Sequence, residues 1–112
     1  MSVEMMMSTT FDLPGFTVVR QMGLTWGVLV RSVGFARGIS GSFKALAAGE
    51  VSEYTDVVNQ ARTTAVERLI IHAQQLGANA VLGVRFDSSD VGNGLTEILA
   101  YGTAVVVAPQ QN

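Results

Sequence analysis

Residues 52–87 read SEYTDVVNQARTTAVERLIIHAQQLGANAVLGVRFD, and this stretch carries the strongest structural signals in the chain. Ser52 can cap the start of a helix, and Glu53 places a carboxylate at the positive end of the helix dipole. Gly77 is a typical stop, because glycine readily adopts the left-handed conformation that ends a helix. The sequence therefore predicts one long helix that ends just before Gly77, followed by a strand over residues 80–87.

The predicted helix has an unusually wide apolar surface. At ~100° per residue, its apolar side chains spread over roughly 220°, whereas a surface helix usually shows a stripe a little over ~100° wide. The arc comprises Val57, Val58, Ala61, Ala65, Val66, Leu69, Ile70, Ala73 and Leu76. We therefore expect the helix to be covered on two sides, by its own sheet and by a neighbouring subunit. The small side chains of Ala61 and Ala65 would let that neighbour approach closely.

Two further segments are predicted to be strands. Residues 16–33 show the period of two that is typical of a strand, and Gly23 and Gly27 indicate bulges or a bend within it. Residues 96–107 are predicted to form the last strand. We expect it to pair with the strand before it as a hairpin, with a loop over residues 88–94.

The rest of the chain is expected to be short or loose. A helix period over residues 42–48 predicts a short helix. Residues 1–10 are expected to form a loose leader, residues 11–108 a single domain and residues 109–112 a tail. Together the elements predict an α+β fold, an antiparallel sheet with one long helix across a face.

Composition limits the classes of function. Hydrophobic residues make up 48% of the 112 residues and charged residues only 14%, which favours self-association because so short a chain cannot hide that much apolar surface. No apolar run is long enough for a membrane span, and the absence of a secretion signal predicts a cytoplasmic protein. A net charge of −2 with one lysine, Lys44, argues against nucleic acid as a partner. The absence of cysteine excludes disulfides and zinc–thiolate sites.

One set of residues is specific enough to suggest a relationship. It consists of Ala61, Arg62, Ala65, Leu69, Ala73 and the run LGANAVLGVRFD over residues 76–87. This frame resembles the YbjQ-like family of small bacterial proteins, which have no agreed reaction and are often labelled "putative heavy-metal-binding". Residues 8–10, 16–22 and 102–105 extend the resemblance to almost the whole chain. The resemblance implies a dodecin-like subunit assembled into a ring, with five copies as the expected number.

The resemblance has one departure that concerns metal binding. Some members of the family carry a cysteine in the first strand, where this chain has Met22. A thioether is a weaker ligand than a thiolate. A metal ion is the cofactor that the resemblance implies, but the sequence does not identify it.

His72 and Trp26 are the candidate binding residues, since each is the only one of its type. His72 could bind a metal ion together with copies of itself around a ring axis, or it could pack at a subunit contact. Trp26 could stack on a flat ligand between subunits, or pack in the core or an interface. Arg62 and Arg68 lie on or near the apolar arc, where each could pair with a carboxylate of a neighbour.

Three weaker patterns have both a chemical and a structural interpretation. Asp87, Asp90 and Glu97 could hold a hard cation or be solvated charges near a turn. Met5–Met7 could be soft ligands for Cu(I) or an extended start of the chain. Gly38–Ser42 could cradle an anion or form a bend, and it matches neither a P-loop nor a dinucleotide fingerprint.

These observations favour a non-enzymatic protein. There is no cysteine nucleophile, and the single histidine has no evident serine–acid constellation around it. The leading hypothesis is a ring-forming homo-oligomer of the YbjQ-like kind. The alternative is an oligomer that binds or stores a small ligand in pockets between its subunits.

Overall fold

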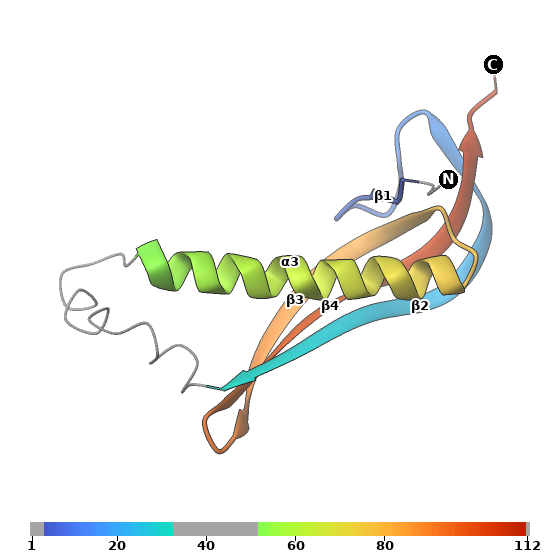
Figure 1. The fold of residues 1–112 in the computed structure, drawn as a ribbon. Helices are drawn as coiled ribbons and strands as arrows, with labels where there is room; N and C mark the ends of the chain where they lie inside the picture. Colours follow the sequence, from blue (N-terminus) through green and yellow to red (C-terminus); the bar gives the residue numbers. More distant parts are fainter. Residues whose placement is uncertain (1–3, 33–51, 112) are drawn as a thin grey trace.

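The computed structural model describes residues 4–32 and 52–111, and it consists of one long helix packed on a four-stranded sheet (Figure 1). Its elements are β1 (Met6–Met7), β2 (Phe16–Ser32), α3 (Ser52–Gln75), β3 (Ala80–Gly92) and β4 (Leu95–Pro109). The predicted α+β class and the long helix are confirmed. The short helix expected over residues 42–48 lies outside the described residues. Within those residues, no helix is both long enough and apolar enough to cross a membrane.

The sheet is mixed, with the strand order β1-β3-β4-β2. Strand β4 runs antiparallel to both of its neighbours, β2 and β3. Strand β1 instead pairs in parallel with β3, so that Met6 lies opposite Ala80 and Met7 opposite Val81. The prediction of an antiparallel sheet is therefore wrong at this edge, because it did not include the start of the chain.

The start of the chain belongs to the fold from Met5 onward. Met5 is buried in the main core cluster, and the backbone N–H of Ser8 donates to the carbonyl oxygen of Val81 at 3.0 Å. Over residues 5–10 the structure thus differs from the expected loose leader, while residues 1–3 lie outside the described part. The physical reason is the open edge of β3, whose unpaired backbone groups offer partners to an extended segment.

Helix α3 lies directly on β2 at Gly27. A Cβ atom at this position would overlap the carbonyl oxygen of Ala65 and the backbone nitrogen of Leu69, so the approach requires glycine. The helix meets the sheet through a buried row at intervals of four, Ala61, Ala65, Leu69 and Ala73. The small side chains of Ala61 and Ala65 serve this contact within one copy, which corrects the expectation that they receive a neighbouring subunit.

Two polar contacts fix the layers. The fully buried hydroxyl of Thr25 donates to the carbonyl oxygen of Leu69 at 3.0 Å. The Asn79 amide accepts from the backbone N–H of Val107 at 2.8 Å and donates to its carbonyl oxygen at 2.9 Å. Because buried polar groups need partners, these bonds hold the helix on β2 and the α3–β3 connection on β4.

The hairpin of β3 and β4 closes through Asn93 and Gly94. Their φ angles of 55° and 73° are the positive values that a type I′ turn requires. Strand β3 continues to Gly92, so the predicted loop over residues 88–94 is reduced to this turn. The polar residues over 88–92 suggested a loop, but they can belong to a strand because side chains on both faces of β3 are exposed in this segment.

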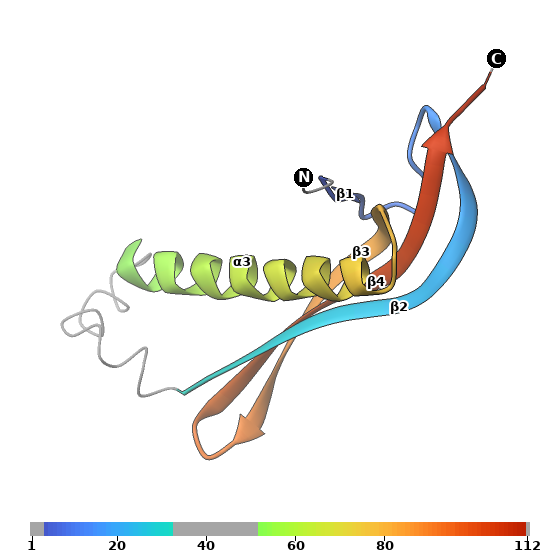
Figure 2. The ribbon, with the colours of Figure 1, turned by 45° about the vertical axis from the view of Figure 1, so that its right-hand side comes forward.

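Strand β2 is bent near its start. Its pairing with β4 shifts register between Val18 and Arg20 and again between Gln21 and Gly23, and Gly23 has a φ of 107°. The bulge predicted at Gly23 is confirmed, and β2 and β4 curve together beyond the end of the helix (Figure 2).

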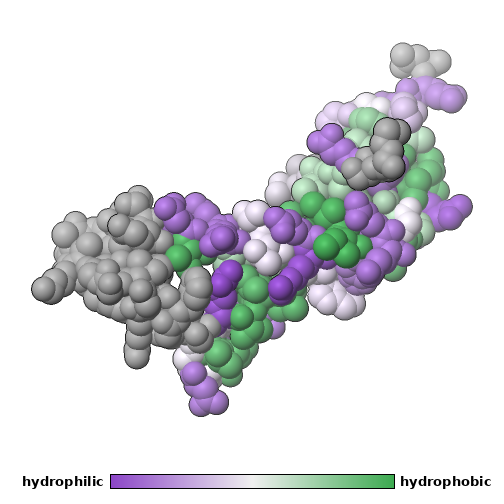
Figure 3. Space-filling view, in the orientation of Figure 1, coloured by the Kyte–Doolittle hydropathy of each residue, from purple (hydrophilic) through white to green (hydrophobic). Residues whose placement is uncertain are grey.

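The sheet face opposite α3, called the outer face below, is covered only in part. Because side chains alternate along a strand and Thr25 faces the helix, the outer face carries the even-numbered β2 residues Leu24, Trp26 and Val30. These three side chains are 47–60% exposed. Figure 3, which views the molecule from the side of α3, shows further apolar residues at the surface near the hairpin and at the curved end of the sheet.

Candidate functional site

The two candidate residues His72 and Trp26, far apart in the sequence, lie against each other in the structure. Their rings form an edge contact with centroids 4.4 Å apart and an angle of 77° between the planes. The backbone N–H of Trp26 also donates to Nδ1 of His72 at 3.3 Å. The contact forms because α3 lies over β2, which is the edge strand.

This hydrogen bond determines which ring nitrogen of a neutral His72 carries the proton. When Nδ1 accepts a hydrogen bond, the proton of a neutral imidazole sits on Nε2. Nε2 then has no lone pair to offer a metal ion, and binding through it requires the other tautomer, which breaks the bond to Trp26. In this arrangement His72 holds the helix against the edge of β2.

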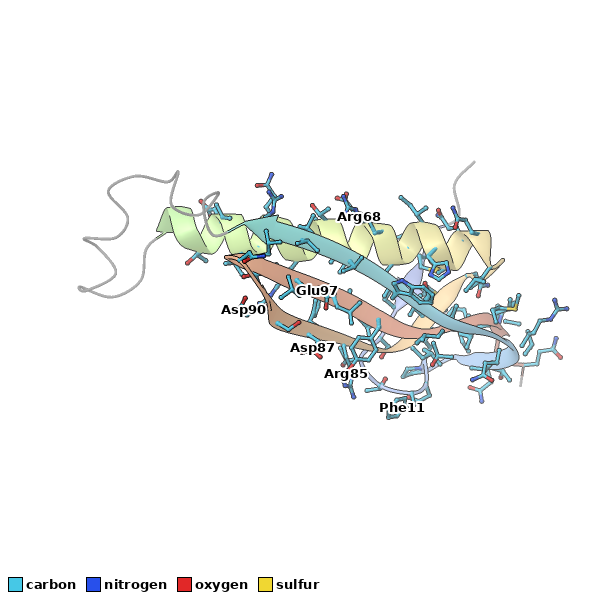
Figure 4. The ribbon with its side chains drawn as sticks, turned by 90° about the horizontal axis from the view of Figure 1, so that it is seen from below. Phe11, Arg68, Arg85, Asp87, Asp90 and Glu97 are labelled. Atoms are coloured by element: carbon cyan, nitrogen blue, oxygen red, sulfur yellow. The ribbon has the colours of Figure 1, made fainter. Side chains whose placement is uncertain are left out.

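Arg68 makes a second contact of the same kind. Its Nη1 donates to the carbonyl oxygen of Val28 at 2.7 Å, one turn of helix before His72. The two side chains together cover the outward-facing backbone of β2 between Trp26 and Val28, and we call them the edge clamp. Figure 4 shows Arg68 on the helix beside β2. The structure thus gives Arg68 a partner in its own chain, where the sequence suggested a carboxylate of a neighbour.

A shallow depression of about 320 Å³ lies on the outer face next to this contact. It is lined by Leu24 and Trp26 of β2, Leu99 and Tyr101 of β4, and Asp87 of β3. The register explains the grouping: Tyr101 pairs with Trp26, and Leu99 pairs with Asp87. Two aromatic rings and one carboxylate therefore face the same space, which we call the outer-face pocket.

The three carboxylates near the hairpin do not converge on one point. Asp87 lines the outer-face pocket, and Glu97 lies one row further along the same face, 3.5 Å from the hydroxyl of Ser89. Asp90 is on the helix side by alternation, and its Oδ1 accepts from the backbone N–H of Gly92. Figure 4 shows the three side chains spread along the hairpin.

The methionines are dispersed in the same way. Met5 is buried in the core and Met6 packs against a separate cluster, while Met7 is exposed. Met22 packs against the main core. Within residues 4–32 and 52–111, no three His, Cys, Asp or Glu side chains are close enough to hold a metal ion together.

Arg62 lies away from the edge clamp, on the other side of the helix. It lines two adjoining depressions that share the half-exposed ring of Phe86, with volumes of about 240 Å³ and 340 Å³. The predicted anion cradle at Gly38–Ser42 falls outside the described residues, as does Lys44.

Sequence reasoning missed Tyr101 and Leu99 as lining residues of the outer-face pocket. The period of two over the last strand does place both on one face. The strand register, which brings Tyr101 beside Trp26, was needed to connect them to a site.

The comparisons with known proteins find matches over almost the whole chain. The YbjQ family model, described as "Putative heavy-metal-binding", matches residues 5–108. A UPF0145 protein of Methanoregula boonei is 51% identical over 98% of this chain and 92% of its own. A UPF0145 protein of Thermoplasma acidophilum is 50% identical over 93% of this chain and 87% of its own.

A solved structure has a similar fold. It is a protein of unknown function of the DUF74 family from Pediococcus pentosaceus, with a TM-score of 0.61, 15% identity, and coverage of 93% of this chain and 98% of that one. At this identity the likeness concerns the fold alone. The family match and the high identities to UPF0145 proteins show that this chain belongs to the YbjQ (UPF0145) family.

Proposed function

We propose that this protein is a non-catalytic, ring-forming homo-oligomer, whose copies join edge to edge through their sheets. The observation that carries the proposal is the presence of two different open edges on opposite sides of one sheet. In the order β1-β3-β4-β2, strand β2 forms one edge, while β1 covers only the first two residues of β3. Open edges present unpaired backbone groups and readily accept another strand.

Among the described residues, no strand pairs with the outer side of β2 over residues 16–24, and this segment carries several exposed apolar side chains. The edge clamp blocks it only between Trp26 and Val28. Before the clamp, Val19 is 59% exposed and Leu24 60% exposed. Exposed apolar side chains on an unpaired strand favour burial against a partner.

The β3 edge is open over residues 86–92. The segment around Ser8 follows β3 as far as Val84, whose N–H donates to the Ser8 carbonyl oxygen at 3.0 Å. Beyond that point no described strand pairs with the outer side of β3. Phe86 and Val91 are 48% and 51% exposed there.

The two edges have opposite charge. Strand β2 carries Arg20 and Arg31 and no acidic residue, whereas residues 86–92 of β3 carry Asp87 and Asp90 and no basic residue. This complementarity favours the pairing of β2 of one copy with β3 of the next and disfavours the pairing of like edges.

A contact between two different edges closes into a ring or continues as a filament. Family membership supports a ring, and five copies is the number that the resemblance predicts. A role in binding rather than catalysis is supported by the structural use of His72, which accepts a hydrogen bond from the Trp26 backbone.

The family label raises the question of a heavy metal. The described residues do not fit such a centre within one copy, because the methionines are dispersed and the one histidine uses Nδ1 in the edge clamp. A site shared between copies of His72 remains a prediction of the sequence. It would require rupture of the bond to Trp26.

Native mass spectrometry of the untagged protein, purified without chelator, tests the assembly. We expect a mass near five subunits. Val19→Lys and Val91→Lys should each reduce the protein to single copies, because each places a charge on one of the two paired edges. Ile71→Lys is the control for an added charge, since Ile71 is an apolar residue of the helix that is 53% exposed and belongs to neither paired strand.

A mixing experiment tests the head-to-tail pairing itself. Each edge variant keeps one intact edge, so an equimolar mixture of Val19→Lys and Val91→Lys should give the mass of two subunits and nothing larger. If wild type is a single copy at micromolar concentration, the proposal is wrong. If the mixture stays monomeric while wild type assembles, the interface lies elsewhere.

A further inference from the structure

The outer-face pocket combines two features that together select a class of ligand. Its walls are apolar or aromatic, from Trp26, Tyr101, Leu24 and Leu99, and its only ionisable acid is Asp87. The pocket is therefore an apolar surface with one negative charge at its side. Ligand sites commonly have this composition, in which a few polar groups fix the orientation of an apolar molecule.

Trp26 is already held in place for such a role. His72 packs edge-on against its ring, and its backbone N–H is tied to the same histidine. The side chain is still 47% exposed. The ring is thus held by a contact within the chain while about half of the side chain remains accessible, so ligand binding need not order the ring.

Within the described residues Asp87 forms no ion pair, although it also borders the depression on the helix side that Arg62 lines. Oδ1 of Asp87 accepts a hydrogen bond from the backbone N–H of Ser88 at 2.9 Å. The neighbouring base on β3, Arg85, lies opposite Tyr101 and donates to the carbonyl oxygen of Thr9 at 2.7 Å. Its guanidinium carbon lies 5.8 Å from the centroid of the Phe11 ring, and Figure 4 labels both residues on the sheet side of the molecule.

A second carboxylate adds to the negative charge on this face of the sheet. Glu97 lies one row beyond Leu99 on the same face, beside Ser89. An anion would therefore be repelled. A neutral flat ligand would pack on Trp26 but would remove water from Asp87 without offering it a charged partner, which is unfavourable.

We propose that the outer-face pocket binds a small organic cation, an amine or quaternary ammonium group on an apolar body, between the Trp26 ring and the Asp87 carboxylate. The aromatic face attracts the cation through its quadrupole, and the carboxylate attracts it directly. The pocket does not require the proposed ring, because all five lining residues come from one copy; in such a ring Asp87 would also lie at the edge that meets β2 of the next copy.

The test uses choline and its neutral isostere 3,3-dimethylbutan-1-ol, with the emission of Trp26 as the signal. As Trp26 is the only tryptophan, any change reports on this pocket. We expect a saturable change with choline and none with the isostere at equal concentration. Saturation-transfer NMR on the choline methyl protons gives a second measurement that does not depend on tryptophan.

Asp87→Asn and Asp90→Asn form a matched pair of variants. Both carboxylates accept a backbone N–H at 2.9 Å near the hairpin, but only Asp87 lines the pocket. We expect Asp87→Asn to weaken choline binding about fivefold and Asp90→Asn to leave it unchanged. Equal binding of choline and its isostere, or equal effects of the two variants, would overturn the proposal.

Native mass spectra of the same samples separate this proposal from the ring. A protein that binds choline as a single copy would disprove the ring and leave the cation site standing. If choline instead dissociated an assembled ring, a cationic side chain of a second copy would be the natural occupant of the pocket, and the cation-binding proposal would be wrong.

Discussion

The two faces of the sheet contrast in an unexpected way. The face toward the helix is buried and carries small residues, among them Thr25, Gly27, Ala100 and Ala104. The outer face carries the large apolar residues Leu24, Trp26 and Val30, which are about half exposed. The larger side chains of β2 are therefore the less buried ones.

The contrast shows that side-chain size alone is a poor guide to burial in this chain. The helix backbone approaches β2 so closely at Gly27 that no side chain fits at this position. Leu24, Trp26 and Val30 lie on the opposite face, where the described residues leave them about half exposed. We infer that the helix side stabilises the single copy, while the outer face and the edges serve contacts with other molecules.

The largest effect is expected from Gly27→Ala, on the helix side. The added methyl group would overlap the backbone of α3 at Ala65 and Leu69, which cannot move without shifting the helix. We expect a loss of about 3 kcal/mol in the free energy of unfolding, measured by urea denaturation.

Gly23→Ala is the comparison variant. A Cβ atom there meets nothing within 4 Å, but the φ of 107° is strained for alanine. We expect a smaller loss, about 1–2 kcal/mol. Equal losses for the two variants would mean that the overlap with the helix backbone at Gly27 adds little to the loss in the free energy of unfolding.

A smaller effect is expected from Thr25→Val. This change removes the buried hydrogen bond to Leu69 and keeps the shape of the side chain, so the loss should be about 1 kcal/mol. Thr103→Val, the same substitution on the outer face, should stay within about 0.5 kcal/mol of wild type. Chemical denaturation of both proteins measures the difference, and a reversed order would contradict the assignment of the two faces.

The smallest effect on stability is expected from His72→Ala, at the border between the faces. It removes the acceptor of the Trp26 N–H, so exchange of this amide with deuterium should become about fivefold faster. Arg68→Ala removes the other half of the edge clamp and should leave the Trp26 amide protected. Unchanged exchange in His72→Ala would show that the bond does not persist in solution.

Local signals predicted the helix and the hairpin well. These signals depend on residues that are close in sequence. The structure has a helix that begins at Ser52 and ends two residues before Gly77, and a tight turn at Asn93 and Gly94. Strand β1 was missed because its pairing with β3 depends on an edge that exists only in the folded sheet. Ala61 and Ala65 were placed in an interface because the width of an apolar arc does not tell which side faces the sheet.

The candidate site was predicted only in part. His72 and Trp26 were selected because each is unique in the chain, and the structure brings them into contact. That contact could not be derived from sequence, since it depends on where α3 crosses β2. Tyr101 and Asp87 join Trp26 in one pocket only through the register of three strands.

The pairing of β2 with β4 has a kinetic consequence. Phe16 pairs with Pro109, so this part of the sheet joins the two ends of the described chain, whereas the helix and the β3–β4 hairpin form from neighbouring residues. Contacts between distant segments form late, because loop closure must come first. We expect β2 to pair with β4 last during refolding. Trp26 contacts His72 only after this step, so a change in its emission would report when β2 has joined the sheet.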